Sequence, residues 1–173
     1  IVDVARYFLA FTQSESCGKC VPCRLGTKQM LNILENICQG KGKVEDIDLL
    51  LKVSQQIKAG SLCALGGTAP NPVLTTIRYF QDEYEAHIKE KRCPALVCPE
   101  LISYYILADK CQGCGICLRA CPTEAITGGK RMVHVIDQSK CNKCSTCLNV
   151  CPDRFGAVVK VSGKEIKVPK KPV

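Results

Sequence analysis

The stretch "CQGCGICLRACP" (Cys111–Pro122) decides the fold of the second half of this chain. The same frame returns thirty positions later as "CNKCSTCLNVCP" (Cys141–Pro152). Each copy has three cysteines at intervals of three residues and a fourth that precedes a proline. In such runs the three spaced cysteines hold one [4Fe–4S] cluster, and the fourth holds the neighbouring cluster. The repeat therefore predicts two [4Fe–4S] clusters that exchange one ligand each.

This exchange assigns every cysteine of the repeat to a cluster. One predicted set is Cys111, Cys114, Cys117 and Cys151, and the other is Cys141, Cys144, Cys147 and Cys121. The apolar stretches "MVHVI" and "AVVKV" predict short strands, so residues 107–161 are expected to form a two-cluster bacterial ferredoxin-like α+β domain. A pair of zinc knuckles is the alternative, but zinc does not require a shared fourth ligand before a proline in both copies.

The first half, residues 1–88, is predicted to be a small four-helix bundle with short connections. Apolar residues recur there at helical spacing. The expected inward positions are Val4, Phe8 and Phe11 in the first helix, Leu31, Leu34 and Cys38 in the second, Val44, Ile47, Leu50, Leu51 and Ile57 in the third, and Val73, Ile77, Phe80, Tyr84 and His87 or Ile88 in the fourth. The fold class predicted for the whole chain is therefore α+β, a helical bundle followed by the ferredoxin-like domain.

A third cysteine group, "ESCGKCVPCRLGT" (residues 15–27), lies in the helical half. Cys17, Cys20 and Cys23 repeat the three-residue spacing, but no cysteine follows at the ferredoxin offset. Cys38 and Cys63 are the candidates for a fourth ligand. Cys38 falls on an apolar helical face, where a buried thiol is a common filler. Cys63 falls in a glycine-flanked loop, where a ligand can be presented freely, so the spacing favours Cys63 and a third [4Fe–4S] cluster.

The same segment, together with "SLCALGGTAPNPVLTTIRYFQDEYEAHI" (residues 61–88), resembles a known family. It is similar to the C-terminal iron–sulfur domain of the NADH-oxidising flavoprotein subunit of complex I. The cluster ligands of that family correspond to Cys17, Cys20, Cys23 and Cys63. With the ferredoxin-like part appended, the chain resembles the beta subunit of electron-bifurcating [FeFe]-hydrogenases.

This resemblance implies an electron-transfer region of an NAD(P)H-linked enzyme subunit. Three [4Fe–4S] clusters would relay electrons between flavin or partner subunits and a hydrogenase or free ferredoxin. The chain opens at Ile1 inside a helical pattern, so we expect a piece of a longer polypeptide, with FMN and NAD(P) bound in its N-terminal part. No glycine-rich nucleotide loop and no substrate site is predicted in this segment. The corresponding subunit of an NAD(P)-dependent formate dehydrogenase or of an NADP-reducing hydrogenase, or a ferredoxin-type carrier, is the alternative.

Three cysteines are left over, and all lie near the predicted domain boundary. Cys38, Cys93 and Cys98, with His87, have the composition of a closed zinc site, and residues 89–106 are expected to be a linker that contains it. The alternative is that Cys38 is core, Cys93 and Cys98 are idle or form a disulfide, and His87 simply ends a helix. His134 lies between valines in a predicted strand and is expected on the surface.

The composition limits the class of protein. The chain has 173 residues, 15 cysteines and a net charge of +8. Each oxidised cluster with four thiolates carries about −2, so three clusters cancel about 6 of these positive charges. Nucleic-acid binding is therefore not expected, and with 5% aromatic residues and no tryptophan the chain lacks stacking platforms for bases. No signal peptide or membrane span is found, thiolate ligands need a reducing compartment, and a cytoplasmic location is predicted. Residues 162–173 are expected to be a basic, extended tail.

Overall fold

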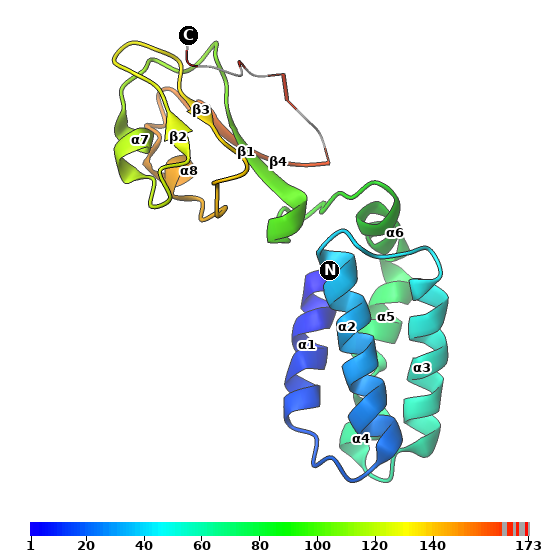
Figure 1. The fold of residues 1–173 in the computed structure, drawn as a ribbon. Coiled ribbons are helices and arrows are strands. Elements are labelled where there is room, and N and C mark those ends of the chain that lie inside the picture. Colours follow the sequence, from blue (N-terminus) through cyan, green and yellow to red (C-terminus); the bar gives the residue numbers. More distant parts are fainter. Residues whose placement is uncertain (164–165, 168, 170–171, 173) are drawn as a thin grey trace. The chain divides into compact units, whose positions relative to one another are not determined.

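The computed structural model of the chain describes residues 1–163, 166–167, 169 and 172. It divides into two compact units, Ile1–Leu101 and Ile102–Val173, and each is described by itself (Figure 1). Half of the basic tail predicted for residues 162–173 (164–165, 168, 170–171 and 173) lies outside the described residues. No helix among the residues described is both long and apolar enough to cross a membrane.

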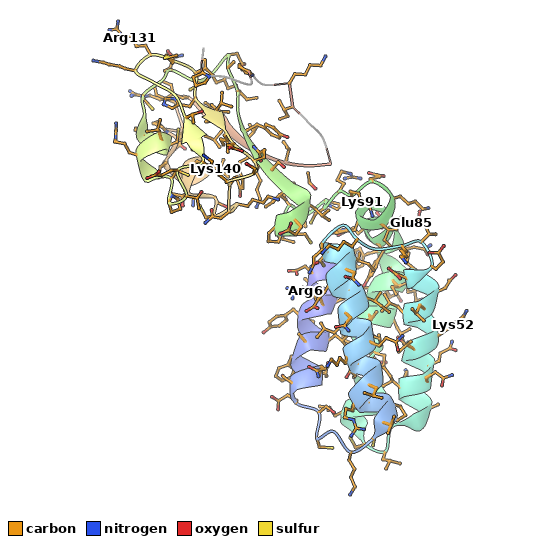
Figure 2. All side chains as sticks on the ribbon, in the orientation of Figure 1. Arg6, Lys52, Glu85, Lys91, Arg131 and Lys140 are labelled. Carbon is orange, nitrogen blue, oxygen red and sulfur yellow. The ribbon has the colours of Figure 1, made fainter. Side chains whose placement is uncertain are left out.

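The first unit is helical. Its elements are α1 (Val2–Ser14), the π-helical turn η1 (Pro22–Gly26), α2 (Thr27–Cys38), α3 (Asp46–Gly60), α4 (Ala64–Thr68), α5 (Asn71–Tyr79), α6 (Gln81–Lys89) and the 3₁₀ turn η2 (Pro99–Leu101). Helices α1, α2, α3 and α5 run side by side, with α4 at one end of them and α6 toward the other (Figure 1). Lys52 of α3 points away from the other helices (Figure 2).

The buried faces of these helices share one apolar core. It is built from Val2, Ala5 and Leu9 of α1, Met30, Ile33, Leu34, Ile37 and Cys38 of α2, Leu50 and Ile57 of α3, Val73 and Ile77 of α5, and Tyr84 and Ile88 of α6. The buried Ser54 hydroxyl of α3 lies 3.7 Å from the Met30 sulfur. Of the cysteines Cys17, Cys20, Cys23 and Cys63, only Cys23 is buried.

The inward face predicted for the first helix is wrong. Val4, Phe8 and Phe11 are 48%, 49% and 57% exposed, whereas Leu9 on the neighbouring face is fully buried. The segment "VDVARYFLAF" is apolar on nearly all sides, so apolar residues recur at helical spacing on two of its faces. Helix α1 packs against α2 and α5 with the face that carries the small Ala5. Val44 was also expected inside, but it precedes α3 and is exposed.

The fourth predicted helix is broken in two. Phe80 has φ −139° and ψ 39°, ends α5 and begins α6, and its side chain is exposed rather than inward. The break turns α6 so that Tyr84, His87 and Ile88 are all buried. The hydroxyl groups of Tyr84 and Thr76 lie 2.8 Å apart and tie the two helices together across it. Burial raises the pKa of Tyr84 to about 12.

The second unit contains two copies of a strand–helix–strand motif. The first copy is β1 (Ile102–Ile106), α7 (Ile116–Ala120) and β2 (Ile126–Thr127), and the second is β3 (Val135–Ile136), α8 (Thr146–Val150) and β4 (Val158–Ser162). The pairing crosses between the copies, because β1 is antiparallel to β4 and β2 is antiparallel to β3. In register, Tyr104 faces Lys160 and Ile126 faces Ile136.

Strand β1 falls in the stretch that the sequence predicted to be linker. Residues 102–106 alternate buried and half-buried side chains and pair along their whole length with β4. The prolines Pro94 and Pro99 that suggested a linker lie before this strand, in the first unit. The predicted strand "MVHVI" is reduced to Val135–Ile136, whereas "AVVKV" forms most of β4.

Candidate metal centres

Two cavities in the second unit gather the cysteines of the repeat. The first is lined by Cys111, Cys114, Cys117 and Cys151, together with apolar side chains that include Ile106 and Val158. The second is lined by Cys141, Cys144, Cys147 and Cys121, together with Tyr104, Ile126 and Ile136 among others. Each cavity therefore holds three cysteines of one copy and the last cysteine of the other, the same sets that the exchange pattern assigns.

The backbone that presents these cysteines is the same in both copies. Gly115 (φ 74°) and Ser145 (φ 67°) are left-handed residues that begin α7 and α8. A left-handed residue there reverses the chain, so the next cysteine, Cys117 or Cys147, enters the first helical turn and points inward. Gly113 (φ 63°) also needs this freedom, since a Cβ there would lie 2.6 Å from the backbone nitrogen of Met132.

Burial makes the inward cysteines poor acids in the absence of a metal. It raises the pKa of Cys117 and that of Cys147 to about 11, with smaller contributions from the neighbouring cysteines of each cavity. Four thiolates cannot collect in an apolar cavity without a compensating positive charge. Iron ions supply such a charge and bind thiolates, so the donor set and its burial fit a [4Fe–4S] cluster in each cavity.

The sulfurs of the second cavity have donors from the protein. The backbone N–H of Ala125 donates to the Cys121 sulfur at 3.4 Å. Burial alone raises the pKa of Cys121, but hydrogen bonds from Thr123, Ala125 and Ile126 outweigh it and lower that pKa. The hydroxyl of Thr146 lies 3.2 Å from the Cys144 sulfur. Donors of this kind stabilise a thiolate and the charge of a cluster bound to it.

His134 is buried, which corrects the prediction that it lies on the surface. It is 2% exposed and lines the first cavity. Its Nδ1 lies 3.8 Å from the Cys111 sulfur, and its Nε2 is a buried polar atom without a partner in the described part of the chain. Burial lowers the pKa of His134. The alternation along the strand places His134 and Ile136 on the inward face, with the two flanking valines only half-buried.

The third cysteine group lies at one end of the helices of the first unit. Cys17 and Cys20 lie in the loop before η1, Cys23 lies in η1, and Cys63 immediately precedes α4. The loop after α1 and helix α4 lie at the same end (Figure 1). Helix α4 packs closely on η1, because a Cβ on Gly66 would lie 3.2 Å from that of Cys23. Cys38, the other candidate, lies instead at the far end of α2.

Local hydrogen bonds hold this loop in place. The hydroxyl of Ser16 lies 3.3 Å from the Cys23 sulfur and accepts a hydrogen bond from the backbone N–H of Gly18. The Arg24 guanidinium donates to the carbonyl of Gly18 at 2.8 Å. The hydroxyl of Thr27 donates to the carbonyl of Cys23 at 2.6 Å, within the π-helical turn. Sequence reasoning missed Ser16, although a hydroxyl beside a ligand segment is a usable signal.

A separate group of metal-binding side chains lies at the other end of the first unit. The ligand atoms of His87, Cys93 and Cys98 all lie within 4.8 Å of one another, and all three residues are buried. The Nδ1–H of His87 donates to the carbonyl of Glu83 at 2.7 Å, which leaves the lone pair of Nε2 free, 3.5 Å from the Cys98 sulfur. A carbonyl partner of this kind fixes the tautomer in which histidine binds a metal.

Cys38, the fourth ligand predicted for this group, lies beside it but outside the set of atoms within 4.8 Å. Cys38 and Cys98 share a hydrogen bond, which raises the pKa of Cys98, with burial adding to the increase, and lowers the pKa of Cys38. Cys38 is therefore within hydrogen-bonding reach of one of the three grouped ligands, Cys98. The set of three sulfurs and one imidazole fits tetrahedral Zn²⁺ in composition.

Comparison with known proteins agrees with this division of the chain. Residues 3–87 match the family described as NADH-ubiquinone oxidoreductase-F iron-sulfur binding region. Residues 110–155 match the family described as 4Fe-4S dicluster domain. These matches confirm that the first part is similar to the iron–sulfur region of NADH-oxidising flavoprotein subunits and that the second part is of the dicluster type.

The relatives are subunits of oxidoreductase complexes. The NADP-reducing hydrogenase subunit HndC of Solidesulfovibrio fructosivorans is 51% identical over 134 residues, 78% of this chain and 27% of its own length. An NADH-quinone oxidoreductase subunit of Mycobacterium bovis is 46% identical over 94 residues, 54% of this chain and 21% of its own. A solved NAD+-reducing [NiFe]-hydrogenase aligns with 51% of this chain and 15% of its own at 33% identity and a TM-score of 0.49. The chain thus spans about a quarter of the relatives' length.

Proposed function

We propose that this chain is the electron-transfer region of an NAD(P)H-linked flavoprotein subunit and holds three [4Fe–4S] clusters. The observation that carries the proposal is that two separate cavities are each lined by four cysteines in the exchanged pattern. When bound, such clusters accept and donate single electrons, at potentials set by the surrounding protein. The third cluster would be held by Cys17, Cys20, Cys23 and Cys63, supported by the packing of α4 on η1.

The chain's own part in this function is to present thiolates and control their surroundings. The apolar linings of the two cavities exclude water, and the left-handed residues Gly115 and Ser145 aim the inward cysteines. Donors beside the sulfurs, such as the Ser16 and Thr146 hydroxyls, stabilise negative charge there. All four ligands of each proposed cluster come from protein, so no position is left open for a substrate, and the proposed role is relay rather than chemistry on a bound molecule.

We further propose that the subunit belongs to a hydrogenase complex. The alignment with HndC covers 134 residues, more than the 101 of the first unit, so it extends into the ferredoxin-like unit. This supports a hydrogenase subunit, whose partners would be the other subunits of the complex or free ferredoxin. Electron bifurcation at a flavin in the N-terminal part of the longer polypeptide is the finer form of the proposal. The corresponding subunit of a formate dehydrogenase is the alternative.

The proposal is tested by metal analysis and EPR of the anaerobically purified chain. Three clusters require about twelve irons per chain and signals from three reducible centres. The Cys63→Ala variant should lose about four of these irons, whereas Cys38→Ala, the matched control from the same unit, should lose none. Iron loss in Cys38→Ala but not in Cys63→Ala would reassign the third cluster. A chain with no reducible signal after anaerobic purification would overturn the relay.

We also propose a zinc ion bound by His87, Cys93, Cys98 and Cys38, with a structural role in the first unit. The buried group of three ligand atoms and the fixed tautomer of His87 support it. About one zinc per chain is expected, and substitution by Co²⁺ should give the absorption of a tetrahedral site rich in sulfur. The His87→Ala variant should lose the zinc and keep its iron. Full iron without zinc in the unsubstituted chain would rule out this site and leave the relay intact.

A further inference from the structure

Several side chains that line the two cavities of the second unit occupy equivalent positions of the repeat. A shift of thirty residues relates Cys111 to Cys141, and Ile106 of the first cavity to Ile136 of the second. The same shift relates Tyr104, which lines the second cavity, to His134, which lines the first. Both rings are buried, on the inward faces of β1 and of the strand segment around β3. An aromatic ring therefore covers each cavity, and one of the two is an imidazole.

The polar atoms of these two rings have different partners. The Tyr104 hydroxyl forms a hydrogen bond with the hydroxyl of Ser145, and Ser145 is not a proposed cluster ligand. The Nδ1 of His134 lies 3.8 Å from the sulfur of Cys111, a proposed cluster ligand. The second cavity thus keeps the ring's polar group away from its sulfurs, whereas the first directs it at one of them.

The position of the proton on His134 follows from the contacts of its two nitrogens. With the proton on Nε2, a buried N–H would have no acceptor, and the lone pair of Nδ1 would face the lone pairs of the Cys111 sulfur. With the proton on Nδ1, this N–H donates to the sulfur, and only an acceptor remains unpaired. Buried unpaired N–H groups are rare, so the second arrangement is favoured.

Gly128 holds the ring in this orientation. A Cβ at Gly128 would lie 2.4 Å from Cδ2 and 3.0 Å from Nε2 of His134, so the backbone of Gly128 packs directly on the side of the ring that faces away from Cys111. No side chain larger than hydrogen fits there without moving the imidazole. The close approach leaves the ring little room to turn Nδ1 away from the sulfur.

We propose that His134 is a positioning residue for the cluster of the first cavity, and that its Nδ1–H donates to the Cys111 thiolate and raises the reduction potential of that cluster alone. A donor to a ligand sulfur stabilises the more negative, reduced state more than the oxidised state. The inference rests on the proposed function, since it requires a cluster at Cys111, Cys114, Cys117 and Cys151.

The test compares His134→Phe with Tyr104→Phe in the complete, iron-loaded chain by potentiometric titration followed by EPR. His134→Phe keeps a ring and removes the donor, so one of the three couples should become harder to reduce by about tenfold, or about 59 mV for one electron. His134→Asn, which retains an N–H donor near Nδ1, should recover part of the shift. Tyr104→Phe, which removes a hydroxyl from the second cavity, should leave unchanged the couple that shifts in His134→Phe.

A second measurement needs no substitution. In the unsubstituted chain labelled with ¹⁵N-histidine, the reduced cluster of the first cavity should show a hyperfine coupling to one histidine nitrogen, and this coupling should be absent in His134→Phe. Normal iron content and EPR signals with no coupling, or with unshifted potentials in His134→Phe, would overturn the role of His134 and leave the relay standing. Absence of iron from the unsubstituted chain would instead overturn the proposed function itself.

Discussion

The two units hold their cysteines in different ways. In the second unit, every buried apolar residue described except Ile102 lines one of the two cysteine cavities. The first unit has an apolar core of its own along α1, α2, α3, α5 and α6, and its cysteine loop lies at one end of the helices. From this difference we expect the fold of the second unit to depend on its metal, and the helices of the first unit to persist without a cluster.

Removal of iron should give the largest effect. Treatment of the anaerobic chain with an iron chelator should abolish the protection of backbone amides from hydrogen exchange in the second unit. The reason is that the free energy of metal binding contributes directly to the folding of such a unit. The helices of the first unit should keep their protection, since Leu34, Leu50 and the rest of its core are unaffected. Hydrogen exchange read by mass spectrometry separates the two units.

Reconstitution with iron and sulfide is the control, and it should restore protection in the second unit. If that unit kept its protection without iron, its fold would not depend on the clusters. Loss of protection along α2 and α3 would show that the first unit also needs its metals.

A substitution in the core of the first unit should come next in size. Leu9→Ala empties a fully buried site and should lower the free energy of unfolding by about 2–5 kcal/mol. Phe8→Ala, the next residue along α1, is about half exposed and should change it by no more than about 0.5 kcal/mol. Urea unfolding followed by helical circular dichroism measures both variants.

Equal costs for the two substitutions would contradict the orientation of α1 described above. The iron content of both variants should match that of the unsubstituted chain, since both residues lie in α1, before the loop that carries Cys17 and Cys20.

Backbone strain in the second unit should give a smaller effect. Gly113→Ala places a side chain at φ 63° and within 2.7 Å of the backbone of Arg131 and Met132. A cost of about 1–3 kcal/mol is expected from the left-handed conformation and the collision. Because metal and fold are coupled in this unit, the variant should also lose its iron to a chelator sooner. An unchanged rate of iron loss would argue against the loop geometry.

The smallest predicted effect has the opposite sign. Gly67 lies in α4, and a Cβ there would meet no atom within 4 Å. Gly67→Ala should therefore stabilise the first unit by about 0.4–1 kcal/mol through the unfolded chain, as measured by the same urea titration. Destabilisation would contradict the open space beside Gly67.

The sequence predicted the grouping of the repeat cysteines because that information is local and is repeated. The spacing of Cys111, Cys114 and Cys117 indicates that these three residues bind the same cluster. In the structure they line one cavity together with Cys151. The face of α1 could not be predicted, because Val4, Phe8 and Leu9 are all apolar and only contacts with other helices distinguish them. The break at Phe80 likewise depends on packing rather than on any proline or glycine at that position.

His134 was misplaced for a reason that the repeat itself could have corrected. Its valine neighbours suggested that the polar residue of the strand faces water. The residue thirty positions earlier is Tyr104, in a segment where 102, 104 and 106 are buried. Comparing the two copies residue by residue would have placed His134 on the inward face with Tyr104. A repeat carries information about orientation as well as about ligands.

The crossed pairing of the strands has a consequence for dissecting the molecule. β1 pairs with β4 and β2 with β3, and each cavity takes its last cysteine from the other copy. A polypeptide with only one copy would have no partner for either of its strands. It would also supply only three of the four ligands for its cluster. Two such polypeptides related by a two-fold axis would satisfy both needs, so the second unit is equivalent to a symmetric dimer whose subunits are covalently joined. Because the two halves are joined in one chain, equivalent positions can differ, as Tyr104 and His134 do.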